Sequence, residues 1–449
     1  MTPASTATGG VPAVSVTRGI AVEAVHRFVG RALGGALSLL ALHVALRHFG
    51  AGRWGEIVAA SAWVGIFAVL GEFGIGTAGA RDLPDPETGS PRARSATFVV
   101  GLASSVVATL AMLAAGAAVY HTRPAIFHLV VLLAPMVPFA VLWTIGGTLL
   151  STYRRSNLRA VLDVLSSALL LGTALVVTRD HLGTGWYATG VACSTVATGA
   201  LAVVLVTRVA PVKLSARHLR EDVVARVVAT RVVGIVVVSN LLYAYADIFL
   251  LSLLATTAQV GYYGVAAQVA GFVMAVPLLV LNPAVGRFLA ADLVGQARIL
   301  QYLLDVLVGG VLLGAAVLFV ASRQIMELVA GPAAAGATLP FALLLVATVL
   351  LFVSSPVVSA LVWTRHEGVA ARIYLLALVV NVGVNVGLDP WFGARGAAGA
   401  MIASETVICV AGLGAYRART GFSPRLRVPL VSGFLAALVV LCGELVRYA

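Results

Sequence analysis

Residues 96–120 read ATFVVGLASSVVATLAMLAAGAAVY and contain no charged side chain. A helix needs about 20 mostly apolar residues to cross the hydrocarbon core of a bilayer, so this stretch can span one. The stretch is typical of the whole chain, in which 60% of the 449 residues are hydrophobic and 11% are charged. Soluble domains carry about 25% charged residues. We therefore predict a multi-pass, all-α membrane protein.

The same reading predicts thirteen spanning helices, of which the last is short and flanked by Arg427 and Arg447. The expected spans are 27–46, 55–79, 96–120, 125–150, 158–178, 185–207, 227–253, 260–286, 299–321, 339–363, 369–388, 396–415 and 428–446. A basic linker at 211–225 divides the first twelve into two six-helix lobes, at 17–210 and 226–416. Residues 1–16, which are small, polar and uncharged, are expected to form a disordered cytoplasmic tail.

The loop arginines and the single lysine predict the orientation, because positive residues gather on the cytoplasmic side of a membrane. Of the 30 basic residues, 21 fall on the side of the N-terminus, seven on the other side, and Arg31 and Arg231 fall inside spans. The sequence therefore predicts a protein of a bacterial-type inner membrane with a cytoplasmic N-terminus.

The two predicted lobes resemble each other weakly, which indicates a duplicated six-helix unit. An even number of helices per unit keeps both copies in the same orientation, and such parallel repeats are found in transporters whose substrate site lies between the halves. Four features recur in the same order: Arg31-x-x-Gly34 and Arg231-x-x-Gly234, Gly55 and Gly261, Arg81 and Arg287, and glycine-rich turns at 183–185 and 393–396.

Three segments resemble the polysaccharide-exporting, lipid-linked oligosaccharide flippases of the superfamily that also holds the MATE drug exporters and the lipid II flippases. The segments are Glu72-Phe73-Gly74-Ile75 with Arg81-Asp82; Tyr245-Ala-Asp247-Ile248 with Val260-Gly261-Tyr262-Tyr263-x2-Ala266; and Asn381-x3-Asn385-x4-Pro390-x2-Gly393-x2-Gly396-Ala397-Ala398-x-Ala400. The resemblance implies two MATE-like lobes in a V-shaped bundle. It also implies export of an undecaprenyl-pyrophosphate-linked glycan by alternating access.

The chain departs from the drug exporters in its first helix, where they commonly carry an acidic cation site. Here that helix has Arg31 and no acid after Glu23. The extra C-terminal helix is also unusual for the oligosaccharide branch.

A flippase breaks no covalent bond, so we expect neither catalytic residues nor a cofactor. The three cysteines lack metal-ligand spacing, and no metal site is predicted. The net charge of +12 raises nucleic acid as a partner. The basic residues are scattered between apolar runs, without interleaved aromatic residues, so we reject nucleic acid.

A pyrophosphate entering the bilayer needs cationic donors, and arginine suits it through paired N–H contacts. Arg31 and Arg231 lead the candidates, because an arginine within a span costs about 2.5–3.5 kcal/mol on insertion scales. Arg81 and Arg287 end their helices and complete a possible quartet, and Gln268 is a candidate for the cavity wall. The alternative is that Arg31 and Arg231 reach the lipid headgroups and that Arg81 and Arg287 anchor helix ends.

Three acids are candidates for ion coupling: Glu72, Asp163 and Asp247. Asp163 can instead pair with Arg159 one turn earlier, and Asp247 can meet water at the outer end of its helix. A further set of polar residues is expected to join helices by hydrogen bonds, namely Asn240, Asn381 and Asn385.

The function expected from these features is transport of a lipid-pyrophosphate-linked oligosaccharide from the cytoplasmic to the outer leaflet. Its expected partners are that lipid, the membrane lipids, and the polymerase and glycosyltransferases of one pathway. An ion-coupled exporter of drugs or cations and a lipid II flippase remain as alternatives. A membrane-embedded glycosyltransferase is disfavoured, because the predicted loops are too short to hold a catalytic domain.

Overall fold

The computed structural model describes residues 13–83, 85–213, 216–421, 423–425 and 427–448. Within these ranges the regular structure is helical and contains no strand. The helices are α1 (Ala13–Glu72), α2 (Ile75–Asp82), α3 (Pro91–Val119), α4 (Pro124–Leu133), α5 (Met136–Thr152), α6 (Ser156–Arg179), α7 (Thr184–Val209), η1 (Ala216–His218), α8 (Leu219–Leu254), α9 (Thr257–Met274), α10 (Val276–Ala290), α11 (Leu293–Val320), α12 (Ser322–Ala330), η2 (Pro332–Ala337), α13 (Thr338–Trp363), α14 (Glu367–Phe392), α15 (Ala394–Thr420) and α16 (Arg427–Tyr448).

Helix α1 consists of two legs, because Gly50 interrupts it with φ 71° and ψ 170°. Glycine accepts this conformation without the penalty that a Cβ atom would bring. The legs correspond to the first two predicted spans. The second leg ends at Phe73 and Gly74, both of which have positive φ, and α2 follows in a new direction.

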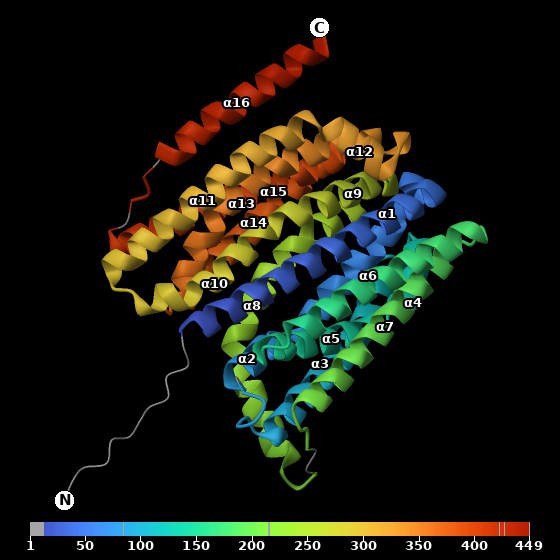
Figure 1. Cartoon of the computed structure of the whole chain (residues 1–449). Coiled ribbons are helices and arrows are strands. Elements are labelled where there is room, and N and C mark those ends of the chain that lie inside the picture. Colours follow the sequence, from blue (N-terminus) through green and yellow to red (C-terminus); the bar gives the residue numbers. More distant parts are fainter. Residues whose placement is uncertain (1–12, 84, 214–215, 422, 426, 449) are drawn as a thin grey trace, which may run out of the picture.

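The helices form two bundles that lie side by side in Figure 1, α1–α7 in blue to green and α8–α15 in green to orange-red. Helix α16, in red, lies outside the second bundle against α11. The end of the bundles where α2 ends and α3 begins is called the Arg92 end. The end where α3 gives way to α4 is called the Arg123 end. This arrangement confirms the predicted fold class of two six-helix lobes with an additional C-terminal helix.

The boundary before α8 differs from the predicted linker, since α8 already begins at Leu219. Glu221 and Asp222 lie in its first turn, where negative charge is favoured by the helix dipole. Of the predicted tail, residues 1–12 lie outside the described part, and residues 13–16 belong to α1.

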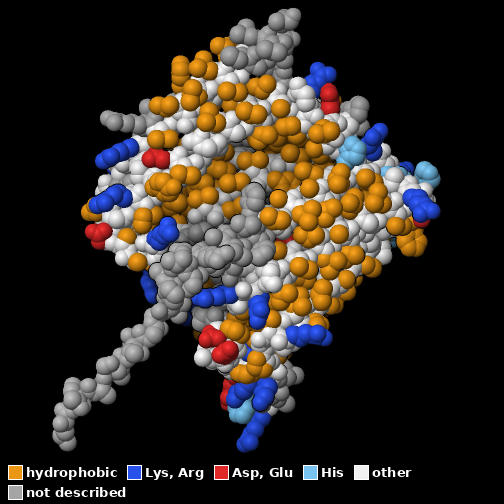
Figure 2. All heavy atoms as spheres, in the orientation of Figure 1, with side chains coloured by type: hydrophobic (Ala, Val, Ile, Leu, Met, Phe, Trp, Pro, Cys, Tyr) orange, Lys and Arg blue, Asp and Glu red, His pale blue; other side chains and the backbone are white. Residues whose placement is uncertain are grey.

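Nine helices in the described ranges are long and apolar enough to cross a membrane, or ten if the bent pair α4 and α5 is one span. The predicted count is higher for two reasons. The two legs of α1 are counted as one span although Gly50 separates them, and only the described parts of α8 and α16 enter the count, where the apolar stretches are Tyr245–Leu254 and Val431–Leu441. Figure 2 shows hydrophobic side chains over the middle of one face and basic side chains at its margins, as the bilayer requires.

The halves approach closely where α1 and α9 cross near the Arg123 end. A Cβ atom on Gly55 would lie 2.9 Å from the Gly261 nitrogen, and one on Gly261 would lie 3.3 Å from the Gly55 nitrogen. Near the Arg92 end the connection is made by α8. Its Arg226 pairs with Asp82 of α2 at 3.0 Å, and its Asp222 pairs with Arg92 of α3 at 3.1 Å.

Candidate functional site

A polar cavity of about 350 Å³ lies between α1, α5 and α6 of the first half and α9 of the second. Arg31, Arg159, Asp163 and Gln268 contribute polar groups to its wall. Because both halves contribute to the wall, a relative movement of the halves would change the cavity.

The polar cavity adjoins a second one of about 590 Å³, and Ser38 and Gln268 belong to both walls. The second cavity is mainly apolar and aromatic, with Trp54, Tyr187 and Tyr245 in its wall. The two cavities follow the first leg of α1 from Gly30 toward the Arg123 end. Together they form a seam with Arg31 and Arg159 at one end and with Trp54, Tyr187 and Tyr245 at the other.

Arg159 is held in the polar cavity by two contacts. Its guanidinium carbon lies 4.3 Å from the ring centre of Trp143, and its Nε donates to Asp163 Oδ1 at 3.3 Å. Gly147 makes room for this side chain, because a Cβ there would come within 3.0 Å of Arg159 Cδ. The sequence suggested the Arg159–Asp163 pair but counted Arg159 with the loop arginines. Trp143 and Gly147 lie four residues apart on α5 and contact Arg159 near the start of α6. That spacing alone was too weak a signal to predict the site.

Of the four arginines expected to form a quartet, Arg31 alone lies in the wall of this cavity. Arg81 has a 60% exposed side chain and pairs with Asp82 at 3.0 Å. Arg231 and Arg287 are exposed on α8 and α10. The structure therefore brings Arg31, which is itself exposed, into one cavity wall with Arg159, while the other three lie outside this wall.

Glu72 stabilises the break between α1 and α2. Its carboxylate accepts hydrogen bonds from the backbone N–H groups of Gly74 at 2.8 Å and Gly76 at 2.7 Å. These donors belong to the free N-terminus of α2, where a carboxylate is favoured. The contacts give Glu72 a local structural role.

Asp247 is buried where α8, α9 and α14 meet. Its Oδ1 accepts hydrogen bonds from Asn381 Nδ2 at 2.7 Å and Asn385 Nδ2 at 2.9 Å, and its Oδ2 accepts one from Tyr263 Oη at 2.8 Å. All three donors are neutral, and no ion pair between described side chains involves Asp247. The structure thus places Asp247, Asn381 and Asn385 in one cluster, whereas the sequence predicted ion coupling for Asp247 and contacts between helices for the two asparagines. Tyr263 was quoted only as part of a motif, and the side chain of Asn240 lies outside the described residues.

The fold is similar to that of solved transporters of the MOP superfamily. The chain is similar to the lipid II flippase MurJ in an inward closed conformation, with a TM-score of 0.71 and 13% identity over 95% of this chain and 98% of that one. It is also similar to an inward-facing multidrug resistance MATE family transporter, with a TM-score of 0.68 and 15% identity over 89% of this chain and 98% of that one.

A third similar structure is a MOP superfamily transporter from Pyrococcus furiosus, described as having a binding pocket of reverse polarity. Its TM-score is 0.53 and its identity 15%, over 94% of this chain and 95% of that one. No protein-family profile and no curated protein sequence matches the chain. At these identities the likeness establishes the fold alone.

Proposed function

We propose that this protein is a flippase that moves a lipid-pyrophosphate-linked oligosaccharide from the cytoplasmic to the outer leaflet. The observation that carries the proposal is the pair of arginines, Arg31 and Arg159, in one cavity between the two halves. A guanidinium group within a span is costly, and it suits the phosphate groups of an anionic lipid. A substrate that is an organic cation would be repelled by this lining.

In this proposal the Arg92 end faces the cytoplasm, in agreement with the excess of basic residues on that side. The pyrophosphate binds Arg31 and Arg159, while Ser38, whose hydroxyl donates to Ser167 Oγ at 3.1 Å, and Gln268 contact the first sugars at the junction of the two cavities. The exposed Arg81, Arg231 and Arg287 attract the anionic headgroup from the inner leaflet. The isoprenoid chain stays in lipid, and the halves move around the headgroup.

We further propose that Asp247 couples this movement to a cation. Glu72 and Asp163 are weaker candidates, because helix N–H groups and Arg159 already compensate their charges. Asp247 has only neutral partners, so the binding of a positive charge would change the balance of forces at a junction of three helices.

Proteoliposomes loaded with an undecaprenyl-pyrophosphate-linked trisaccharide test this function directly. Translocation is followed by the access of an added glycosidase to the sugar. We expect transport by the wild type and a loss of at least about tenfold, equivalent to about 1.4 kcal/mol, in Arg31→Ala combined with Arg159→Ala. Arg323→Ala is the matched control, since this surface arginine is 75% exposed and pairs with Glu327.

Two further arms decide between the alternatives. Lipid II in the same vesicles tests the wall-precursor activity, and ethidium tests export of an organic cation. Transport of ethidium in preference to the lipid-linked trisaccharide, or full transport of the trisaccharide by the double variant, would refute the proposal. The neighbouring genes add an independent check, because a polymerase and glycosyltransferases alongside would support the glycan pathway.

A further inference from the structure

An apolar groove of about 500 Å³ lies where the second leg of α1 and helix α3, from the first half, meet the start of α8, from the second. Its lining is apolar apart from Ser104 and includes Phe67, Leu70, Val100, Val107, Val223 and Val227. Val107 and Val227 are 67% and 52% exposed, so the open side of the groove faces the bilayer.

The wall of the groove suits a hydrocarbon chain of one leaflet. The hydroxyl group of Ser104 already donates to the carbonyl group of Gly71 at 2.5 Å, so the wall offers mainly van der Waals contact. From Val100 to Ala111, both in the wall, α3 rises over eleven residues, which is about 16 Å at 1.5 Å per residue. Half of the hydrocarbon core of a bilayer is about 15 Å deep.

Positive charge borders the groove at the Arg92 end. Arg226 lies between Val223 and Val227 on α8, and its Nη1 donates to Asp82 Oδ2 at 3.0 Å. Arg81 Nε donates to the other oxygen of the same carboxylate, also at 3.0 Å. Arg226 Nε is buried and has no hydrogen-bond acceptor among the described residues. Two guanidinium groups therefore share one carboxylate, which leaves one positive charge without compensation, and the 60% exposed side chain of Arg81 presents it to an anion.

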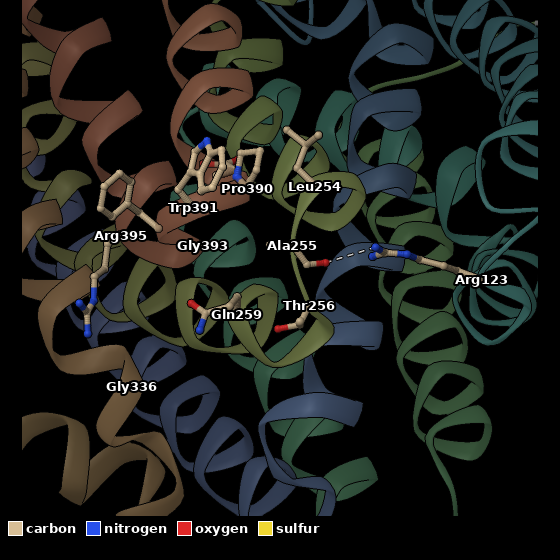
Figure 3. Close-up of a pocket in the computed structure, with 12 residues that line it drawn as sticks. Arg123, Leu254, Ala255, Thr256, Gln259, Gly336, Pro390, Trp391, Gly393 and Arg395 are labelled. Atoms are coloured by element: carbon tan, nitrogen blue, oxygen red, sulfur yellow. Dashed lines mark hydrogen bonds between the residues drawn. The ribbon is translucent and has the colours of Figure 1, made fainter.

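A cavity at the Arg123 end differs from this groove in its lining. Figure 3 shows this cavity between the end of α8, the start of α9 and the turn from α14 to α15. Its volume is about 660 Å³, and Arg123, Thr256, Gln259 and Arg395 contribute polar groups to its wall. That cavity suits water and polar solutes, whereas the groove suits an apolar chain that ends beside a positive charge.

We propose that the groove binds one acyl chain of an anionic glycerophospholipid, whose phosphate group lies against Arg81 and Arg226. Guanidinium groups bind phosphate oxygens through charge-assisted hydrogen bonds, and Arg226 Nε is a donor that the protein itself leaves unused. The groove shares no described lining residue with the two cavities of the seam. This separation favours a resident membrane phospholipid over the lipid that the protein transports.

The bound phospholipid contacts both halves of the protein, because α1 and α3 belong to the first half and α8 to the second. If α8 moves away from α3, the groove loses one of its walls and the acyl chain loses its contacts with Val223 and Val227. The lipid therefore binds more tightly to the arrangement in which α8 lies against α3. A ligand shifts a conformational equilibrium toward the state that it binds better, so anionic lipid stabilises closure at the Arg92 end.

Native mass spectrometry of the purified, delipidated full-length protein tests this site by titration with lipids. The probe is palmitoyl-oleoyl phosphatidylglycerol. Phosphatidylcholine with the same chains tests the need for net negative charge, and undecaprenyl phosphate stands for the transported class of lipid. None of these titrations needs a glycan, so the result is independent of whether glycan transport is found.

Two variants at exposed positions separate the parts of the site. Arg81→Ala removes the excess charge and leaves Asp82 and Arg226 as a balanced pair. Ala111→Trp fills the groove, because a helical side chain points back toward the N-terminus of its helix. Leu102→Trp is the matched control on α3, since Leu102 is 46% exposed and lies outside the groove wall. Arg323→Ala is the control for the loss of a surface charge.

We expect the wild type and both controls to bind phosphatidylglycerol saturably and at least about tenfold more tightly than phosphatidylcholine. Arg81→Ala should lose most of this preference, and Ala111→Trp should bind phosphatidylglycerol at least about tenfold more weakly. The lipid should also raise the thermal unfolding temperature of the wild type more than that of Ala111→Trp. Binding like that of the wild type in Arg81→Ala and Ala111→Trp, or equal affinity for the two phospholipids, would overturn the site. Tighter binding of undecaprenyl phosphate than of phosphatidylglycerol would overturn the assignment to a resident phospholipid.

Discussion

Gly55 of α1 and Gly261 of α9 face each other where the two halves of the protein cross, close enough that a Cβ on either would enter the backbone of the other helix. Small residues at such crossings allow close helix contact in membranes, where van der Waals contact drives helix association. The crossing lies near the Arg123 end, so it can act as the pivot about which the halves move while the cavity changes at the Arg92 end.

Replacement of Gly261 by valine should separate the halves at this crossing. We expect a lower thermal unfolding temperature in detergent, because overpacking typically costs 1–3 kcal/mol. Gly271→Val is a control on the same helix, since a Cβ there meets nothing within 4 Å. Equal unfolding temperatures for the two variants would show that the crossing is not a tight contact.

The Trp143 ring under Arg159 should contribute to substrate affinity. Trp143→Leu keeps an apolar side chain but removes the cation–π contact, which is worth about 0.5–2 kcal/mol. We expect a several-fold rise in the substrate concentration for half-maximal transport, with little change in maximal rate. Trp391→Leu, at an 82% exposed position outside the seam, provides the comparison.

The ion pairs of α8 with α2 and α3 should favour closure at the Arg92 end. Asp82→Asn with Asp222→Asn removes both pairs and leaves Arg226, which is 6% exposed, without its carboxylate partner. The partly exposed Arg92–Asp222 pair contributes about 0.2–1 kcal/mol, and the loss of the partner of the buried Arg226 costs more, so we expect at least a several-fold shift in population from the closed to the open state of the Arg92 end. Ser166 lies in the wall of the polar cavity. A cysteine placed there, in a protein whose native cysteines are replaced, should then react faster with an impermeant thiol reagent. Asp180→Asn should leave the reaction rate unchanged.

Arg94 should stabilise the loop between α2 and α3. The side chain is fully buried and donates to the carbonyl groups of Pro86, Gly89 and Pro211 at 2.6–2.7 Å and to Tyr153 Oη at 3.1 Å. Arg94→Lys cannot reach all of these acceptors, and each buried acceptor left alone costs about 1–3 kcal/mol. We expect faster protease cleavage near residues 85–90 than in Arg92→Lys. Equal cleavage in the two variants would contradict this role.

The Asp247 cluster should respond to the loss of any donor. Asn385→Ala and Tyr263→Phe each remove one hydrogen bond to the carboxylate, and bonds to charged groups contribute about 1.5–3 kcal/mol. We expect both variants to unfold at lower temperature than the wild type. The double variant should lose less stability than the sum of the two single losses. Thr406→Ala, an exposed position on α15, is the control.

Much of the architecture followed from the sequence alone. Runs such as 96–120 must become helices in hydrocarbon, because every backbone polar group has to be paired within its own segment. That local requirement is independent of neighbouring helices, so the helices and the grouping into two lobes could be predicted. The contact between Asp163 and Arg159 could be predicted for the same reason, because the two residues lie four apart on one helix.

The composition of the sites was decided only by the tertiary structure. Arg31 and Arg159 share a cavity, Arg231 and Arg287 do not, and Asp247 meets Asn385 across 138 residues of chain. Which faces of two helices meet depends on close contacts such as Gly55 with Gly261 and on kinks such as Gly50. These depend on the shape of both partners at once, and the apolar pattern of a single helix does not contain that information.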